Sequence, residues 1–182
     1  MLVRRKAILP EVAVDKSRKI FEKLIIAPVF VNARNIGIYS ATKNEVGTDE
    51  IIRYLVASGK SVWLPVAEGK SMDFFRFKGF DRLKKGKFNV PEPERETGEK
   101  TAGELDEFGG LDVIIVPGVC FDSHLHRLGY GKGHYDRYLK TCRAIRIGIC
   151  FDELTVAEIP HDEYDERMDV VMTDARILRR TD

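Results

Sequence analysis

Short apolar runs alternate with segments of helical periodicity along the chain, and this alternation is the strongest constraint on its fold. Five runs have the length and the β-branched or aromatic content of strands: residues 35–40, 61–66, 111–117, 144–151 and 168–174. Residues 73–77 indicate a further edge strand or hairpin arm. Strands that alternate with helices imply βαβ units, so we predict an α/β fold: a single three-layer domain with a largely parallel sheet flanked by helices.

Two helices are predicted in the first third of the chain. From Pro10 to Ile26 the apolar residues recur mainly at three- and four-residue steps, and this helix ends before Pro28. The second helix follows Thr48, which can cap it, and Gly59 can end it.

Residues 78–110 form the longest stretch without periodicity. They are polar and rich in Gly and Pro. We therefore predict a long loop there, with a functional or a linking role.

Length and charge limit the classes of function. A chain of 182 residues with 43% hydrophobic content predicts one domain, residues 1–182. Its net charge of +1 provides no global field to attract nucleic acid or a membrane surface. The three cysteines, Cys120, Cys142 and Cys150, lack CxxC spacing and fit a reducing cytosol. With no signal peptide and no run of 18 apolar residues, we expect a soluble, cytoplasmic protein without nucleic-acid or membrane partners.

The loop after the most apolar strand carries the clearest chemistry. Gly129, Gly131 and Gly133 alternate with Tyr130 and Lys132. The backbone can therefore approach a ligand closely and present successive amides to an anion. Ligands of doubly wound sheets bind beyond the carboxyl ends of the strands, where this loop is expected to lie.

Charged residues flank these glycines. Arg127 and Lys132 add positive charge, and so does the N-terminal end of a helix predicted to begin near Gly133. The alternative is a tight glycine-rich turn without a ligand, but this set of charges favours a polyphosphate site. The pattern is neither GxxxxGK[ST] nor GxGxxG.

Asp136 has two possible roles in the first turn of that helix. It would either stabilise the helix end or hold Mg²⁺ against phosphate oxygens. An acidic loop before the last predicted strand offers Asp165 and Asp169 as second carboxylates, although most such loops are only solvated surface.

The histidines and Cys120 give weaker signals. None of His124, His126, His134 and His161 has metal-ligand spacing. We expect His124 and His126 to face solvent, whereas His134 lies inside the glycine-rich loop and could line a pocket. Cys120 is expected to pack in the interior, since no base is identifiable beside it.

Several motifs together resemble a known family. Residues 116–139, VPGVCFDSHLHRLGYGKGHYDRYL, resemble the signature of the 5-formyltetrahydrofolate cyclo-ligases, also called 5,10-methenyltetrahydrofolate synthetases. Glu45-Val46 before TDEII, VPEPE at residues 90–94 and the segment 161–174 match in the same order. The resemblance implies a NagB/RpiA/CoA-transferase-like fold and a monomer or weak homodimer. It also implies ATP- and Mg²⁺-dependent conversion of 5-formyltetrahydrofolate to 5,10-methenyltetrahydrofolate, with release of ADP and phosphate.

The resemblance also assigns roles residue by residue. Lys132 and Arg127 would be the catalytic cations, and Asp136 and Asp165 would hold Mg²⁺. Glu45 would bind the pterin edge, since a carboxylate can accept two donors from an aminopyrimidine. The triphosphate would lie along Arg127, Leu128, Gly129, Tyr130, Gly131, Lys132, Gly133, His134 and Tyr135. The folate would also meet Ser40, Pro91, Pro93, Tyr130 and His134, whereas Trp63 is expected in the core.

The N-terminus departs from the family pattern. Family members usually carry a Lys-x-x-x-Arg segment that contributes to ATP binding, and Arg4, Arg5 and Lys6 align with the turn after it. Either the natural start lies upstream, or these residues substitute as ATP ligands, or ATP binding is weakened. The last case would leave a catalytically weakened nucleotide- or folate-binding module. His134 also stands where the family usually has Tyr, and Tyr130 fills a variable position.

Overall fold

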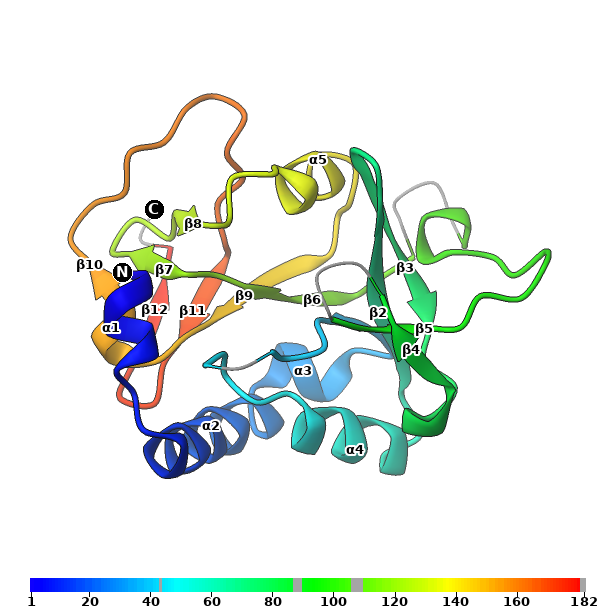
Figure 1. The fold of residues 1–182 in the computed structure, drawn as a ribbon, viewed down its shortest axis with the longest axis horizontal. Helices are drawn as coiled ribbons and strands as arrows, with labels where there is room; N and C mark the ends of the chain where they lie inside the picture. Colours follow the sequence, from blue (N-terminus) through cyan, green and yellow to red (C-terminus); the bar gives the residue numbers. More distant parts are fainter. Residues whose placement is uncertain (43, 87–89, 106–109, 181–182) are drawn as a thin grey trace.

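A seven-stranded sheet forms the centre of the molecule (Figure 1). The computed structural model describes residues 1–42, 44–86, 90–105 and 110–180. The strand order is β12, β11, β9, β6, β1, β2, β3; the five inner strands are parallel, and both edge strands are antiparallel to their neighbours. Their bounds are β1 Asn35–Ile38, β2 Ser61–Glu68, β3 Ser71–Arg76, β6 Val113–Pro117, β9 Ile145–Ile149, β11 Val170–Met172 and β12 Ile177–Arg179.

The sheet confirms the strand prediction. Each of its five parallel strands coincides with one of the five apolar runs, although β2 continues two residues past the predicted end, and β3 is the predicted hairpin arm. β12 was not predicted, because we took the run before it as the last strand. Two of its three residues are exposed, so it carries no apolar run that would reveal it.

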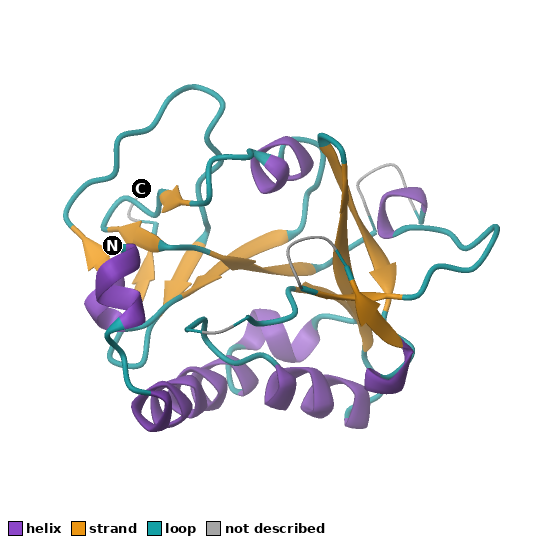
Figure 2. Ribbon diagram, viewed as in Figure 1, coloured by secondary structure: helices purple, strands orange, loops and turns teal. Residues whose placement is uncertain are grey.

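Three helices cover one face of this sheet, the lower face in Figure 2. They are α2 Pro10–Ile25, α3 Pro28–Asn32 and α4 Asp49–Ala57. Pro28 does more than follow α2: it begins α3, at a position where its missing N–H costs nothing. Gly59, with φ +72°, follows the end of α4 as predicted. Thr48 is the N-cap residue of α4, but its hydroxyl accepts the N–H of Ala41 at 3.0 Å, so the predicted side-chain cap is wrong.

The opposite face has a thinner cover. It consists of α5 His134–Leu139 and a small sheet of β7 Cys120–Asp122, β8 Arg127–Leu128 and β10 Thr155–Val156. The helix α1 Leu2–Lys6 contacts the 3₁₀ turn Asp152–Leu154 that leads into β10. With six residues, α5 is much shorter than the sixteen-residue α2 on the other face.

The predicted long loop has structure of its own in its described part. It contains the 3₁₀ turns Phe80–Arg82 and Ala102–Glu104, and β4 Leu83–Lys85 pairs antiparallel with β5 Pro91–Pro93. The loop prediction is therefore wrong here. Each strand is only three residues long, too short to show an alternating pattern, and the prolines are tolerated in a two-stranded pair.

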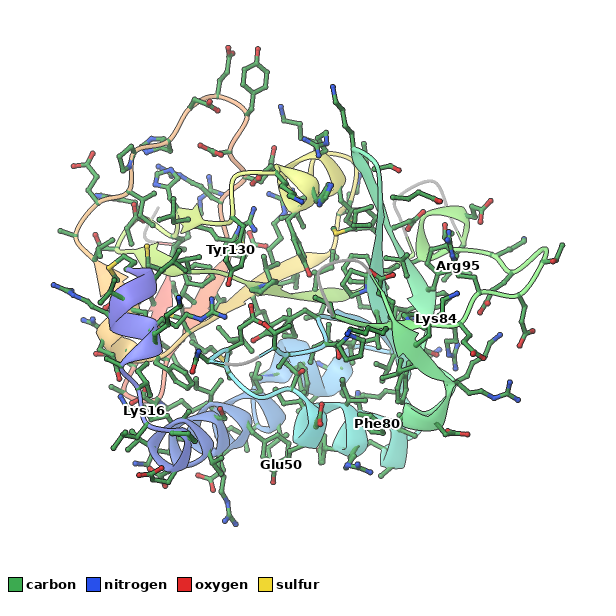
Figure 3. All side chains as sticks on the ribbon, viewed as in Figure 1. Lys16, Glu50, Phe80, Lys84, Arg95 and Tyr130 are labelled. Carbon is green, nitrogen blue, oxygen red and sulfur yellow. The ribbon has the colours of Figure 1, made fainter. Side chains whose placement is uncertain are left out.

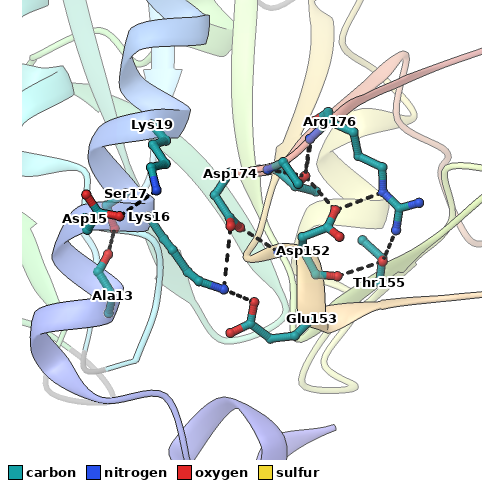
Figure 4. Close-up of polar contacts among 12 residues, drawn as sticks. Ala13, Asp15, Lys16, Ser17, Lys19, Asp152, Glu153, Thr155, Asp174 and Arg176 are labelled. Carbon is teal, nitrogen blue, oxygen red and sulfur yellow. Dashed lines mark hydrogen bonds and ion pairs between the residues drawn. The ribbon is translucent and has the colours of Figure 1, made fainter.

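Ion pairs fix the turn between β11 and β12 to α2 (Figure 4). Lys16 of α2 contacts both Glu153 and Asp174, and Asp174 accepts the backbone N–H of Asp152 at 2.8 Å. Asp152 in turn pairs with Arg176 at 2.8 Å. This network holds the antiparallel edge of the sheet in place.

Gly148 of β9 gives a stability prediction. Its backbone lies against the ring of Phe121, which is fully buried, and an added Cβ would overlap that ring. We expect Gly148→Ala to lower the free energy of unfolding by about 1–3 kcal/mol through overpacking. Gly47→Ala is the matched control, because its Cβ would come no closer than 3.7 Å to any atom. Urea unfolding of both variants tests this, and equal midpoints would contradict it.

Candidate active site

The ends of the central strands enclose a small cavity. Its volume is about 10 Å³, roughly room for one water molecule. Residues at or just after the carboxyl ends of β1, β6 and β9 line it, together with one residue of α1: Arg5, Tyr39, Asn44, Glu45, Val46, Pro117, Gly118, Ile149, Cys150, Phe151 and Leu154. The cavity thus lies where a parallel sheet is expected to bind its ligand.

Arg5 is the N-terminal cation that reaches this cavity. Its side chain is 4% exposed, and Arg4 and Lys6 are exposed. One terminal nitrogen lies 2.9 Å from Glu45 Oε1, and Nε donates to the carbonyl of Asn44 at 2.6 Å. Nη1 is buried and has no hydrogen-bond partner in the described part of the chain. Arg5 therefore has a buried donor left for a ligand or a water.

Glu45 is held by two partners. Its Oε2 accepts the N–H and the hydroxyl of Thr42, at 2.8 and 2.9 Å, while Oε1 faces Arg5. Ser40, 7% exposed, lies just before this loop at the end of β1. Sequence analysis predicted Glu45 as a folate ligand but did not predict its pairing with Arg5.

Two tyrosines with raised pKa values, the buried Tyr39 and the half-buried Tyr135, are influenced by the charge of Glu45. Burial raises the pKa of Tyr39, and the Glu45 carboxylate raises it further. Burial also raises the pKa of Tyr135, against a lowering by Arg127, and Glu45 again raises it. The Tyr39 hydroxyl donates to the carbonyl of Val46 at 2.9 Å, whereas the buried Tyr135 hydroxyl has no hydrogen-bond partner in the described residues. Both phenols are neutral donors at physiological pH.

Arg127 and Asp136 form an ion pair beneath the loop. Arg127 Nη2 lies 2.7 Å from Asp136 Oδ1, and the two side chains are 6% and 19% exposed. The guanidinium carbon lies 5.3 Å from the centroid of the Tyr135 ring. Arg127 Nε is buried and has no hydrogen-bond partner in the described part of the chain. A second arginine thus has a spare donor near the glycines.

The glycine-rich loop itself faces solvent. Lys132 and Tyr130 are exposed, and Figure 3 shows Tyr130 left of the centre of the view, well apart from Lys84 of β4 on the right. Gly131 and Gly133 have φ of +78° and +62°, which only glycine adopts without strain. The helix α5 has six residues, little more than one turn. The positive partial charge that its N-terminal end was predicted to add is therefore small.

The loop rests on the hairpin between β2 and β3. His134 Nε2 lies 3.1 Å from the carbonyl of Gly69, and Arg137 donates to the carbonyls of Lys70 and Lys132. His134 therefore contacts the hairpin turn, and its predicted contact with nucleotide or folate stays a prediction.

The remaining predicted residues lie less closely together. Asp165 is exposed and accepts the N–H of Asp162 at 2.9 Å, although the N–H of the next residue, Glu166, lies 3.4 Å from Asp136 Oδ1. Pro91 and Pro93 belong to β5, which lies beside β2 on the right of Figure 1, away from β8. Leu128 is 42% exposed.

Four predictions concern residues outside the loop. Trp63 is 4% exposed, which confirms that it belongs to the core. All three cysteines are buried and lie outside any disulfide, and burial raises the pKa of the Cys120 thiol, as expected for a packing residue. His124 is exposed as predicted. The prediction for His126 is wrong: this side chain is 4% exposed and bonded to Asp122 and Arg167, neither of which was a candidate.

Comparison with known proteins identifies the family of the chain. A family model described as the 5-formyltetrahydrofolate cyclo-ligase family matches residues 1–174. The chain belongs to this family. It is 32% identical to the 5-formyltetrahydrofolate cyclo-ligase of Mus musculus over 181 residues, which cover 93% of this chain and 87% of the mouse protein. The cyclo-ligase of Escherichia coli K12 is 27% identical over 180 residues, 96% of each chain.

Solved structures agree with the family assignment. The NMR structure of 5,10-methenyltetrahydrofolate synthetase from Aquifex aeolicus has a TM-score of 0.84 and 28% identity, over 98% of this chain and 88% of that chain. A synthetase from Mycoplasma pneumoniae, at 24% identity and a TM-score of 0.73, has the same fold. Cyclo-ligases of this family convert 5-formyltetrahydrofolate to 5,10-methenyltetrahydrofolate with ATP, so the resemblance seen in the motifs is confirmed.

Proposed function

We propose that this chain makes 5,10-methenyltetrahydrofolate from 5-formyltetrahydrofolate at the site beyond β1, β6 and β9, with ATP and Mg²⁺, releasing ADP and phosphate. The observation that carries the proposal is a pair of buried arginines, Arg5 and Arg127, each with a nitrogen that lacks a hydrogen-bond partner in the described residues. A buried donor without a partner is costly, so an anionic ligand that accepts from both would be favoured. A triphosphate along the glycine-rich loop supplies such acceptors.

The chemistry needs charge neutralisation more than acid or base catalysis. The formyl oxygen attacks the γ-phosphorus, the bond to the β-phosphate oxygen breaks, and ADP leaves. The neighbouring anilino nitrogen then attacks the activated formyl carbon, closes the ring and loses its proton as phosphate departs. Lys132 and Arg127 would neutralise the transferred group, and Glu45 would fix the pterin.

The residues present fit an Mg²⁺ ion that binds together with the nucleotide, rather than one held by protein side chains alone. Among the described residues there is no group of three His, Cys, Asp or Glu side chains that could hold a metal. Mg²⁺ in phosphoryl-transfer sites binds through one or two carboxylates and the phosphates, and it offsets phosphate charge. Asp136, near the loop, and Asp165, beside Glu166, are the carboxylates we assign to it.

The folate would lie between the loop after β1 and the glycine-rich loop. We assign Ser40, Glu45, Tyr130 and His134 to it, with Pro91 and Pro93 as a more distant wall. We further propose that the enzyme is a cytoplasmic monomer or weak homodimer, with sedimentation analysis as the test of assembly. In the described part of the chain, no helix has the length and apolar character needed to cross a membrane.

An absorbance assay tests the function directly. Folded protein with ATP, Mg²⁺ and 5-formyltetrahydrofolate should give the near-ultraviolet absorbance of the methenyl product. Calorimetry with ATP and with the folate separates the alternative, because a weakened binding module would bind one of them without turnover. Absence of the methenyl product with folded protein would overturn the proposal, whether or not a ligand binds.

Arg5 gives a prediction specific to ATP. We expect Arg5→Ala to raise the KM for ATP by about 10–100-fold, because hydrogen bonds to a charged group contribute about 1.5–3 kcal/mol each. Arg4→Ala and Lys6→Ala should cause smaller changes, since both side chains are exposed. Initial rates at varied ATP measure this, and an unchanged KM in Arg5→Ala would remove Arg5 from the ATP site.

A further inference from the structure

A buried carboxylate organises the turn that precedes the glycine-rich loop. Asp122, at the end of β7, is 0% exposed. Its Oδ1 accepts the N–H groups of His124 and His126, at 2.9 and 2.8 Å, and Oδ2 accepts the N–H of Ile159 at 2.9 Å. Burial alone would raise the pKa of Asp122, but these backbone bonds and the His126 ring outweigh it and lower the pKa. Asp122 is therefore an anion at neutral pH.

The ring of His126 lies between this anion and a cation. Nδ1 lies 3.2 Å from Asp122 Oδ2, and Nε2 lies 2.9 Å from Arg167 Nε. Arginine nitrogens only donate, so Nε2 must be the acceptor and the proton must be on Nδ1. The ring also stacks on His161, with centroids 3.6 Å apart. The contacts thus define one neutral tautomer of His126.

These contacts connect two segments of the chain. Besides the stack of His161 on His126, residues 159–168 form three hydrogen bonds with the turn: Ile159 to Asp122, Arg167 to His126, and the N–H of Met168 to the carbonyl of Leu125 at 3.0 Å. Leu125 has φ +69°, an unfavourable conformation for leucine that persists only where the surroundings enforce it. The turn is therefore held tightly in one geometry.

Both segments continue directly into the proposed active site. Arg127 follows His126, and Glu166 precedes Arg167. Arg127 Nη2 and the N–H of Glu166 meet at the same atom, Asp136 Oδ1, at 2.7 and 3.4 Å. His126 and Arg167, which contact each other, are thus the sequence neighbours of Arg127 and Glu166, the two residues that donate to Asp136.

We propose that His126 and Arg167 are positioning residues, which fix Arg127 and Asp136 relative to each other without touching substrate. This inference rests on the proposed function, because it assigns Arg127 and Asp136 to the nucleotide site. Among the described residues, the charged or titratable groups in contact with the His126 ring are Asp122 from β7, and Arg167 and His161 from the segment 159–168. Protonation of Nε2 removes the acceptor of Arg167 and places two cations in contact, so acid loosens the alignment.

The test compares three variants in the absorbance assay between pH 5 and pH 8, roughly the range in which histidine changes charge. Arg167→Ala should lower kcat/KM by about 10–100-fold, the range expected for a small misplacement of reacting groups, with a similar Tm. His126→Gln keeps an acceptor for Arg167 but does not titrate, so its rate should fall less than that of wild type on acidification. His124→Ala, an exposed neighbour, should match wild type throughout. Identical profiles of wild type and His126→Gln, or wild-type kcat/KM in Arg167→Ala, would overturn the inference.

Two binding measurements separate this inference from the proposed function. Nitrogen NMR of the imidazoles should show His126 with its proton on Nδ1, and calorimetry should show weaker binding of Mg·ATP by Arg167→Ala than by His124→Ala. These results would support the positioning role even if wild type lacked turnover, in which case only the assigned reaction fails. A proton on Nε2, or equal ATP affinity in both variants, would overturn the positioning role whatever the turnover.

Discussion

Replacing Lys132 by alanine is expected to lower kcat by about 10²–10³-fold, the range found when one preorganised charge-stabilising donor is removed from a transition state. Lys132 is exposed on the loop between Gly131 and Gly133, and we propose that its ammonium contacts the transferred phosphoryl group. Truncation of an exposed side chain should leave the free energy of unfolding almost unchanged. Initial rates of methenyl formation, with urea unfolding alongside, measure both quantities.

Two further lysine variants sharpen that result. Lys19→Ala removes an exposed ammonium from α2, in the helical layer on the other face of the sheet, and should retain wild-type kcat. Lys132→Arg keeps the charge but not the compact ammonium, and should restore only part of the rate. If Lys132→Ala turned over like Lys19→Ala, Lys132 would have no part in the reaction.

The sequence predicted the sheet well because burial on both faces demands continuous apolar runs. β6 and β9 show this: Ile114, Ile115 and Ile147 are fully buried, and both strands lie inside the predicted runs. Elements that need no such run were missed. β4, β5 and β12 are strands of only three residues, and α1 and α3 are five-residue helices, too short to show a period.

The sequence was sufficient to predict which loops form the candidate site. Parallel strands end at one edge of a sheet, so the loops after β1 and β6 had to be neighbours, and Glu45 and Gly118 do line one cavity. Which charges pair with each other was not predictable. The contact of Arg5 with Glu45 joins residues 40 positions apart in the sequence, and it depends on where α1 docks.

His126 shows the same limit more sharply. A histidine in a polar loop, two residues from another histidine, indicates solvent exposure. The ring is buried because the segment 159–168 folds over the turn and brings Arg167 and His161 against it. The nearest local signal was Asp122, a carboxylate that ends the buried strand β7, four residues before His126. A buried acid at that spacing needs donors, and His126 is one of them.

Variants of Arg127 should show whether its guanidinium acts on the transferred phosphoryl group or only holds Asp136 in place. Arg127→Met keeps the apolar stem, removes the buried charge, and is expected to lower kcat/KM by about 10²–10³-fold if the guanidinium stabilises the transferred phosphoryl group. Asp136→Asn should instead act mainly through a higher requirement for Mg²⁺, since the amide retains an oxygen for Arg127 but loses the charge that attracts the cation.

The double variant decides between the two roles. If Arg127 served only to hold Asp136, then Arg127→Met would cost no more than Asp136→Asn, and the pair together would cost no more than either change alone. Because Arg127 Nε is buried with no hydrogen-bond partner among the described residues, we expect the larger loss in Arg127→Met and a further loss in the double variant. Rates measured at saturating Mg²⁺ remove the contribution of Asp136, so a deficit that persists there belongs to Arg127 itself.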